Sequence, residues 1–259
     1  MADVLRSAAL RDAGFAHAFS LRSGGVSDAP YHTLNLGRSV GDDEACVWEN
    51  HIRFAARVPY GRDELFEVSQ VHGVSVRLVA PSEDPRVVRQ EEHDALIAPA
   101  GGLAVGVRTA DCVPILLADT DTGAVAAVHA GWRGAVNHIV PRTIDRMRTE
   151  LGTHPSALVA AVGPHIRVAR FEVGDEVAEA ADAAAQACEP GVSVVVRSAE
   201  TSKAHVDLAA LVRLQLTHAG VTRVDDVGGC TLDDAARFFS YRRDQGRTGR
   251  HLAAIVSHA

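Results

Sequence analysis

The chain has 259 residues, of which 47% are hydrophobic and 23% are charged, values that are typical of a folded globular protein and argue against disorder. Its net charge of −7 and its dispersed arginines argue against a nucleic-acid partner. No apolar run approaches the ~18 to 20 residues that a membrane helix needs, which excludes a membrane-spanning helix. Residues 1–11 do not read as a secretory signal, so we expect a cytoplasmic location.

Short apolar runs predict many β-strands. In chain order these runs are 65–69, 74–79, 103–107, 115–118, 124–128, 158–162, 192–196 and 252–256. The run 115–118 is apolar at every position, as expected of a strand whose two faces are both covered. Sheets inside and helices outside satisfy this pattern.

Helical spacing of apolar residues predicts three helices among these strands. The segment 135–151 contains Pro141, where we expect either a kink or a helix that begins afresh. Residues 175–188 form the second helix, and the third follows Asp207, a predicted N-cap, and ends before Gly220. No repeat or long linker divides the chain. We therefore predict an α+β fold in a single domain, residues 1–259, with stacked mixed sheets flanked by helices.

Three short runs each place a metal-binding side chain where an apolar run gives way to a loop. They are S-Q-V-H-G, T-A-D-C-V-P and V-H-A-G-W-R-G, and the side chains are His72, Cys112 and His129. Two imidazoles and one thiolate suit zinc and leave a fourth tetrahedral position for water or substrate. The three residues are therefore candidate ligands of a catalytic zinc site.

A simpler interpretation stands beside this one. The separations along the chain match no zinc finger or ribbon, and Cys112 alone is equally typical of a small buried hydrophobic residue. Gly73 and Gly131 favour the site, because glycine beside a polar strand end lets the backbone bend sharply or a ligand approach closely. The four cysteines have no CxxC spacing, so we expect free thiols rather than disulfides.

The ordered motifs resemble those of the YfiH family. Besides the three runs above they are G-G-V-S (24–27), L-N-L-G (34–37), V-G-D-D (40–43), F-E-V-G (171–174), F-F-S-Y-R-R-D (238–244) and T-G-R (248–250). The resemblance extends from about Phe15 to the end of the chain. Members of this family have been labelled polyphenol oxidase or laccase-domain protein, peptidoglycan editing factor and purine nucleoside phosphorylase.

The resemblance implies an α+β fold with helices flanking stacked sheets and a zinc ion bound by His72, Cys112 and His129. It also implies phosphorolysis of adenosine, inosine and 5′-methylthioadenosine, and deamination of adenosine. Deamination is compatible with an open zinc site, where bound water has a lowered pKa. Phosphorolysis additionally requires a cationic clamp that orients phosphate against the ribose.

Arginines in the motifs are the candidates for this clamp. We expect Arg133, Arg38 and Arg242 to bind substrate or phosphate, and for each the alternative is a surface or ion-pair role. Asp111, next to Cys112, either orients a metal ligand or caps a loop. Trp132 either walls the pocket or packs in the core.

Other residues receive less weight or bear on specificity. His93 and His165 approach the site only if their loops converge on it. Arg167 and Phe171 depart from the family pattern, in which glycine and tyrosine are usual at these positions. These departures affect the shape and charge of the pocket wall, and with them the preferred nucleoside.

Two other enzyme classes and a binding role stay open. A copper oxidase with several coppers needs many histidines in H-x-H pairs, which this sequence lacks, although copper also fits a His-Cys-His set. A metal-free hydrolase would use Cys112 as its nucleophile, with peptidoglycan precursors as substrates. Non-catalytic binding of a cell-wall precursor is the last alternative. The sequence gives no indication of the oligomeric state.

Overall fold

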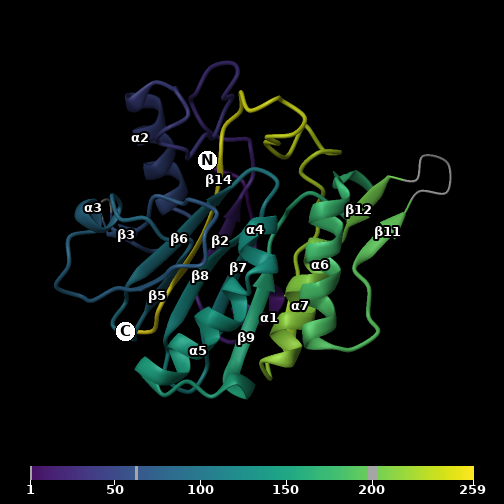
Figure 1. Ribbon diagram of the computed structural model, residues 1–259. Helices are drawn as coiled ribbons and strands as arrows, with labels where there is room; N and C mark the ends of the chain where they lie inside the picture. Colours follow the sequence, from purple (N-terminus) through teal and green to yellow (C-terminus); the bar gives the residue numbers. More distant parts are fainter. Residues whose placement is uncertain (1, 62–63, 198–202) are drawn as a thin grey trace.

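The computed structural model describes residues 2–61, 64–197 and 203–259. Within these residues the chain forms two large sheets and one small one (Figure 1). The five-stranded sheet has the order β1 (Val4–Leu5), β2 (His17–Ser20), β14 (His251–Val256), β6 (Ala104–Thr109), β3 (Leu65–Phe66). The six-stranded sheet has the order β13 (Arg223–Asp226), β9 (Leu158–Val162), β7 (Val113–Asp119), β8 (Val125–Ala130), β5 (Ala95–Ala98), β4 (Val76–Leu78). The small sheet has the order β10 (Glu172–Val173), β12 (Ala204–Val206), β11 (Val195–Arg197).

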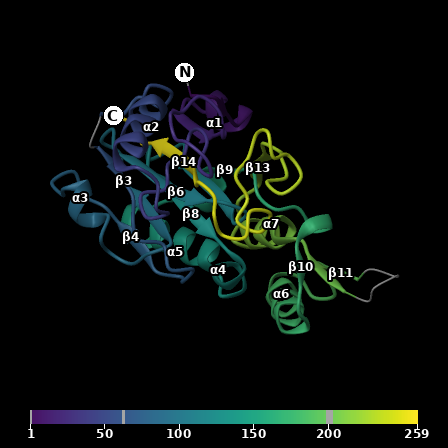
Figure 2. The same cartoon turned by 90° about the horizontal axis from the view of Figure 1, so that it is seen from above.

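Helices cover the outer faces of the sheets. They are α1 (Ala8–Asp12), α2 (Glu44–Ala55), α3 (Pro85–Val88), α4 (Trp132–Val136), α5 (Ile139–Leu151), α6 (Asp175–Cys188) and α7 (Leu208–His218), with short 3₁₀ turns at Pro155–Ala157 and Val168–Arg170. In Figure 2, β10, β11 and α6 extend from the body on the side opposite α2 and α3. No helix among the described residues is both long and apolar enough to span a bilayer.

Strand β7 shows how the layers are built. Leu116 and Ala118 pack with Val105 and Ile255 of the five-stranded sheet, whereas the alternate residue Ile115 packs in the cluster that contains the apolar faces of α5, α6 and α7. Successive strand residues point to opposite faces, so β7 is buried between a second sheet and a helix layer. This confirms the prediction for 115–118 and the α+β fold of stacked mixed sheets flanked by helices.

The predicted strands all overlap observed ones, with some shifts at their ends. The run 65–69 is a strand only at Leu65–Phe66, and the run 192–196 becomes β11 at Val195–Arg197. Helix α2 was not predicted, and the reason is physical. The buried face of α2 consists of Val47, Asn50, His51 and Phe54. Because two of these four residues are polar, the helical period is hidden in the hydrophobic pattern.

Two predicted helices have the expected bounds and one does not. Helix α6 spans Asp175–Cys188, and Asp207 caps α7 by accepting the N–H of Ala210 at 2.9 Å. In the segment 135–151 the break falls ahead of Pro141, at His138, whose φ is 64°. Pro141 lies in the first turn of α5, where its missing N–H costs no helical hydrogen bond. A helix does begin afresh within this segment, as one of the two alternatives predicted, but it begins at Ile139, two residues before Pro141.

The two ends of the chain lie in the same sheet. Strand β14 pairs on one side with β2, where Ala253 faces Phe19, and on the other with β6, where Ala253 faces Val107. The last strand therefore joins the first part of the chain to its middle. On this basis we propose that residues 1–259 are one domain.

Four buried histidines predict that the protein is sensitive to acid. Burial lowers the pKa of each one, to about 4 for His51 and His165, to about 3 for His251, and below the usual value for His17. In the unfolded chain a histidine titrates near 6.5. Between about pH 6.5 and pH 4 the unfolded state thus binds more protons, and stability falls as the pH falls.

We expect the metal-free protein to lose about 1 to 1.5 kcal/mol of unfolding free energy per fully buried histidine between pH 7.5 and pH 5.5. Urea unfolding at the two pH values measures this loss, with metal removed so that release of the metal in acid does not contribute. Substituting alanine for the exposed His154 should leave the pH dependence unchanged. Equal unfolding free energies at both pH values would contradict the prediction.

Candidate metal centre

The pairing of β7 with β8 brings two of the three candidate ligands together. Cys112 immediately precedes β7, and Pro114 of β7 faces His129 of β8 in the antiparallel register. His72 reaches the same point from the loop between β3 and β4. One ligand atom from each of the three side chains lies within 4.8 Å of the others. The predicted His-Cys-His group is therefore present at one edge of the six-stranded sheet.

The spacing of the group fits a metal ion. Cys112 Sγ lies 3.8 Å from His72 Nε2, and the rings of His72 and His129 stand at 77° with their centroids 4.8 Å apart. A tetrahedral zinc with its usual bond lengths separates sulfur and nitrogen ligands by about 3.6 Å. No other His, Cys, Asp or Glu among the described residues joins the group. The side chains present thus suit a three-ligand site with one open position.

A buried carboxylate, Asp94, supports two of the ligands. Its Oδ1 accepts hydrogen bonds from His129 Nδ1 at 2.8 Å and from the backbone N–H of His72 at 2.9 Å, and its Oδ2 accepts one from the N–H of Gly73 at 2.6 Å. Burial raises the pKa of Asp94, but these hydrogen bonds and the charge of His129 hold it below its usual value. With its proton on Nδ1, His129 presents Nε2 to the metal.

The charges within the group favour the thiolate, which is the metal-binding form of Cys112. Burial raises the pKa of the Cys112 thiol, but the positive charge of His129 and hydrogen bonds from both histidines outweigh it and lower the pKa. Burial lowers the pKa of His129, while the Cys112 thiolate and Asp94 raise it overall. Without a cation, both shifts favour a thiolate beside an imidazolium. The thiolate is the form of cysteine that binds metals and attacks electrophiles.

Gly131 leaves room for the ligands, which gives a prediction. A Cβ at this position would lie 2.9 Å from His72 Cδ2 and 3.1 Å from Cys112 Sγ. The backbone is not the obstacle, since φ is −71°. We expect Gly131→Ala to lower metal content several-fold, measured by elemental analysis, while the metal-free protein keeps its fold and melting temperature to within a few degrees.

The chain contains a matched control for this substitution. Gly174, the N-cap of α6, has φ −75° and ψ 164°, against −71° and 168° for Gly131 at the N-cap of α4. A Cβ at Gly174 meets no atom within 4 Å. Gly174→Ala should leave metal content unchanged. Equal metal content in Gly131→Ala and wild type would show that the ligands lie farther from Gly131 than the structure places them.

The group opens into a cavity of about 500 Å³. This volume lies within the range of small-molecule sites. Its walls come from several parts of the chain: the loop that begins in L-N-L-G, the loop after β3, the end of β6 with the turn into β7, the end of β8, the loop after β9, and the C-terminal motifs. The residues that line it are Gly37, Ser39, Val40, Ser69, Gln70, His72, Arg108, Thr109, Ala110, Asp111, Cys112, His129, Ile166, Phe171, Tyr241, Arg242 and Arg250.

The three predicted clamp arginines occupy different places. Arg242 lines the cavity, donates to the carbonyl of Glu172 at 2.6 Å and lies 5.0 Å from the ring centroid of Phe171. Arg38 lines a separate hollow and pairs with the buried Glu67 at 3.3 Å. Arg133 is exposed and lies 4.4 Å from the ring centroid of its neighbour Trp132. Neither Arg38 nor Arg133 lines the cavity that the candidate ligands face.

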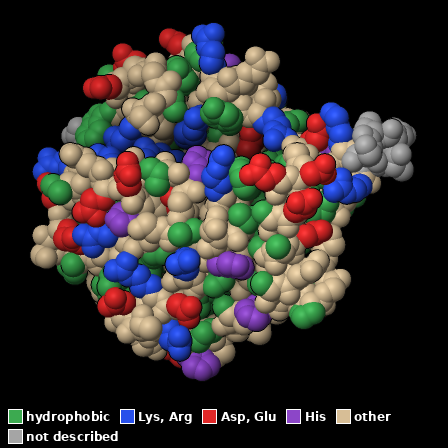
Figure 3. Space-filling view, in the orientation of Figure 1, with side chains coloured by type: hydrophobic (Ala, Val, Ile, Leu, Met, Phe, Trp, Pro, Cys, Tyr) green, Lys and Arg blue, Asp and Glu red, His purple; other side chains and the backbone are tan. Residues whose placement is uncertain are grey.

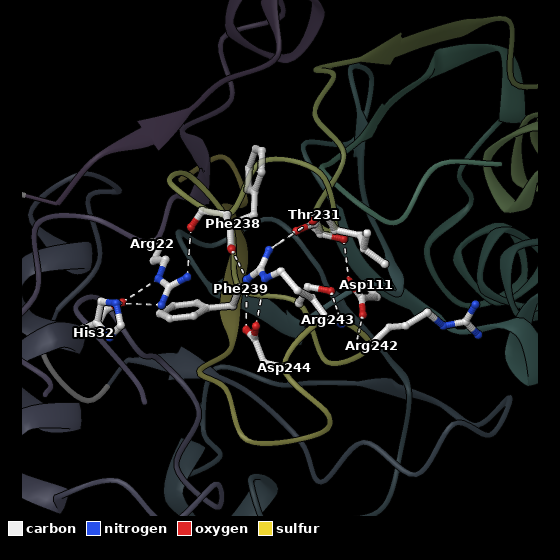
Figure 4. Close-up of polar contacts among 12 residues, drawn as sticks. Arg22, His32, Asp111, Thr231, Phe238, Phe239, Arg242, Arg243 and Asp244 are labelled. Atoms are coloured by element: carbon white, nitrogen blue, oxygen red, sulfur yellow. Dashed lines mark hydrogen bonds and ion pairs between the residues drawn. The ribbon is translucent and has the colours of Figure 1, made fainter. Parts of the chain in front are cut away.

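The C-terminal wall of the cavity is held by hydrogen bonds to its backbone (Figure 4). Asp111 accepts from the Thr231 hydroxyl at 2.6 Å and from the backbone N–H of Arg242 at 2.7 Å. Arg243 donates to the carbonyls of Thr231 and Phe238. Of the two interpretations for Asp111, the structure therefore shows the loop-capping one.

The two departures from the family pattern have distinct roles. Arg167 makes a bidentate pair with Asp226 at 2.7 and 2.8 Å and donates to the carbonyl of Gly229. It ties β13 and the following loop to the loop after β9 and does not line the cavity. Phe171 does line it, as an apolar wall beneath Arg242. Of the two departures, only Phe171 changes the cavity surface.

Other predicted candidates lie outside the cavity lining. His93 bonds to the hydroxyl of Ser75 at 2.7 Å, and His165 is buried with Nδ1 on the carbonyl of Gly163. Trp132 is partly buried against the core. All four cysteines are free thiols, as expected. On the face shown in Figure 3, acidic and basic side chains are intermixed.

Sequence reasoning missed Asp94, Arg108 and Arg250. Asp94 follows His93 at the start of an apolar run, which alone does not distinguish a supporting carboxylate from a strand cap. Arg250 was quoted only as part of T-G-R. Arg250 stands beside an apolar run, as His72 and Cys112 do. This position was the sequence feature that could have identified it.

The fold and site define an α+β protein of stacked sheets with a His-Cys-His group open to a cavity. The chain belongs to the family described as multi-copper polyphenol oxidoreductase laccase, whose model matches residues 16–258. A purine nucleoside phosphorylase of Deinococcus radiodurans is 41% identical over 92% of this chain and 88% of its own length. Another from Pseudomonas aeruginosa is 41% identical over 90% of each chain.

Solved structures show the same fold. YlmD from Geobacillus stearothermophilus superimposes with a TM-score of 0.88 at 30% identity, over 95% of this chain and 93% of that one. YfiH from Bacillus licheniformis gives 0.86 at 25% identity, over 94% and 93%. The resemblance to the YfiH family, predicted from the ordered motifs, is thereby confirmed.

Proposed function

We propose that this protein is a zinc-dependent purine nucleoside phosphorylase that acts on adenosine, inosine and 5′-methylthioadenosine and also deaminates adenosine. The observation that carries the proposal is the three-ligand group facing the cavity. A structural zinc is normally closed by a fourth protein ligand, and none of the described residues supplies one. The names of the relatives that cover nearly the whole chain support the same reaction class.

The residues of the cavity have separable roles in this proposal. His72, Cys112 and His129 would hold the zinc, which would supply Lewis acidity and lower the pKa of bound water. Phe171 and Tyr241 offer ring surfaces for a purine. Arg242 contributes positive charge to phosphate at the cavity wall. The roles expected for Arg133 and Arg38 stay predictions that require their present contacts to rearrange.

Two other enzyme classes differ in metal content. A multicopper oxidase needs several metal sites, whereas one His-Cys-His group is found among the described residues. A single copper on this group is the closest form of that alternative. The lowered pKa of Cys112 beside His129 is compatible with the other alternative, a thiolate hydrolase, for which peptidoglycan precursors are the predicted substrates. About one zinc per chain supports the phosphorylase, copper the oxidase, and an active metal-free protein the hydrolase.

Product identification tests the reaction directly. The purified protein, with its metal content measured, is incubated with adenosine in the presence and absence of inorganic phosphate. Adenine with ribose 1-phosphate, formed only with phosphate, is the expected main result, and inosine reports deamination. Absence of both products would reject the proposal. The cytoplasmic location and the lack of a nucleic-acid partner stay predictions from the sequence.

A further inference from the structure

Two motifs that the metal group leaves unexplained, L-N-L-G (34–37) and T-G-R (248–250), meet at one arginine. Arg250 directly precedes β14, whose first residue pairs with Thr109 at the end of β6, and it lines the cavity. Asn35 Oδ1 accepts the backbone N–H of Arg250 at 2.9 Å, and the Arg250 carbonyl accepts from the N–H of Leu36 at 3.0 Å. The two motifs together hold the backbone of Arg250 at the cavity wall.

The side chain of Arg250 is held in place as well. A Cβ at Gly37 would lie 2.8 Å from Arg250 Cγ, so the glycine of L-N-L-G leaves space for the stem. Nη1 donates to the carbonyls of Thr248 at 2.8 Å and Gly249 at 3.1 Å. The guanidinium carbon lies 5.5 Å from the ring centroid of Tyr241. A side chain ordered in this way loses little further entropy when it binds a ligand.

The guanidinium of Arg250 makes no salt bridge within the described ranges 2–61, 64–197 and 203–259, although the charges of Cys112 and Asp111 act on it at longer range. No carboxylate there lies within ion-pair distance of its guanidinium, and its Nε and Nη2 have no hydrogen-bond partner. Arg108, in the same cavity, differs because it pairs with Glu67 at 3.5 Å. Arginine stays charged at neutral pH, and a half-buried charge without a partner costs free energy that a bound anion would offset.

A second half-buried arginine has the hydrogen-bond partners that Arg250 lacks. Arg22 also lies over an aromatic ring, Phe239, at 5.0 Å. All three of its nitrogens have partners, however: Nε and Nη1 donate to the carbonyls of His32 and Ala235, and Nη2 contacts His32 Nε2. Arg22 is therefore a satisfied structural residue (Figure 4), and it provides a matched control.

We propose that Arg250 binds an oxyanion of the phosphate class in the cavity, through its Nε and Nη2 groups. Two parallel N–H groups of a guanidinium match two oxygens of such an anion. Ser39 and Arg242 line the same cavity and add a hydroxyl and a second guanidinium to its surface. The identification of the anion as the co-substrate phosphate rests on the proposed function, whereas the anion site itself does not.

Titration of the zinc-loaded protein with inorganic phosphate by calorimetry tests the site. We expect Arg250→Gln to weaken phosphate binding about 30-fold or more, with zinc content unchanged. In the assay, its KM for phosphate should rise far more than its KM for nucleoside. Arg250→Lys keeps the charge and loses the planar fork, so its phosphate affinity should lie between those of wild type and Arg250→Gln. Arg22→Gln should lower the melting temperature and leave phosphate affinity unchanged.

A chemical measurement on the wild-type protein covers the case in which Arg250→Gln fails to fold. Inorganic phosphate should protect Arg250, but not Arg22, from modification by phenylglyoxal, as mapped by peptide mass spectrometry. Unchanged phosphate affinity in Arg250→Gln, or no protection in wild type, would overturn the anion site. Phosphate binding that depends on Arg250 in a protein that cleaves no nucleoside would keep the site and reject the phosphorylase.

Discussion

Cys112→Ala should remove the bound metal and the nucleoside activity together. The substitution deletes the single sulfur ligand and leaves two imidazoles, too few to hold zinc against water in an open site. Activity should fall by at least about a thousand-fold, which corresponds to roughly 4 kcal/mol of transition-state stabilisation. Cys112 sits at a strand end beside the cavity, so the unfolding free energy of the metal-free protein should change by less than about 1 kcal/mol.

Elemental analysis, the phosphorolysis assay and urea unfolding of the same preparation measure these three effects. Cys46→Ala is the control, because Cys46 lies in α2, away from the cavity, and is also a free thiol. Full activity and one metal per chain in Cys112→Ala would place the chemistry elsewhere. If the wild-type protein is active without containing metal and Cys112→Ala is inactive, the result would instead support the thiolate hydrolase.

Asp94→Asn is the second substitution with a large expected effect. Asp94 is fully buried, and the partners of its side chain are all donors: the N–H groups of Val71, His72 and Gly73, and Nδ1 of His129. Asparagine has the same shape but places an NH₂ group against donors in either orientation. Each buried donor left unsatisfied costs about 1 to 3 kcal/mol. The loop that carries His72 and the orientation of His129 both depend on these bonds.

We expect Asp94→Asn to weaken zinc binding about 10- to 100-fold, the range for residues that support metal ligands. Competition with a chelator measures this affinity. Asp119→Asn is the matched control, since Asp119 is equally buried and accepts the backbone N–H groups of Asp121 and Thr122 at the far end of β7. Both variants should be less stable, and only Asp94→Asn should bind zinc more weakly. Equal zinc affinities in the two variants would show that Asp94 does not support the metal ligands.

The arginines show where prediction from sequence stopped. A motif identifies a charged residue but not its partner, and ion pairs and cation–π contacts are decided by segments far apart in the chain. Arg38 pairs with Glu67 and Arg133 lies over Trp132, whereas Arg250 faces the cavity. The distinction depends on the partners available to each guanidinium, which local patterns do not contain.

The sequence by itself determined the strands and helices with a strong hydrophobic period, the family, and the His72, Cys112 and His129 set. These follow from local signals: β7 is apolar at consecutive positions, and ligand-type side chains stand where apolar runs end. Only the tertiary structure decided that Asp94 supports two ligands, that Asp111 caps the C-terminal loop, and that Arg250 lines the cavity. Each of these roles depends on contacts between segments far apart in the chain. The hydrogen-bond partners of these side chains come within reach only after the sheets have packed.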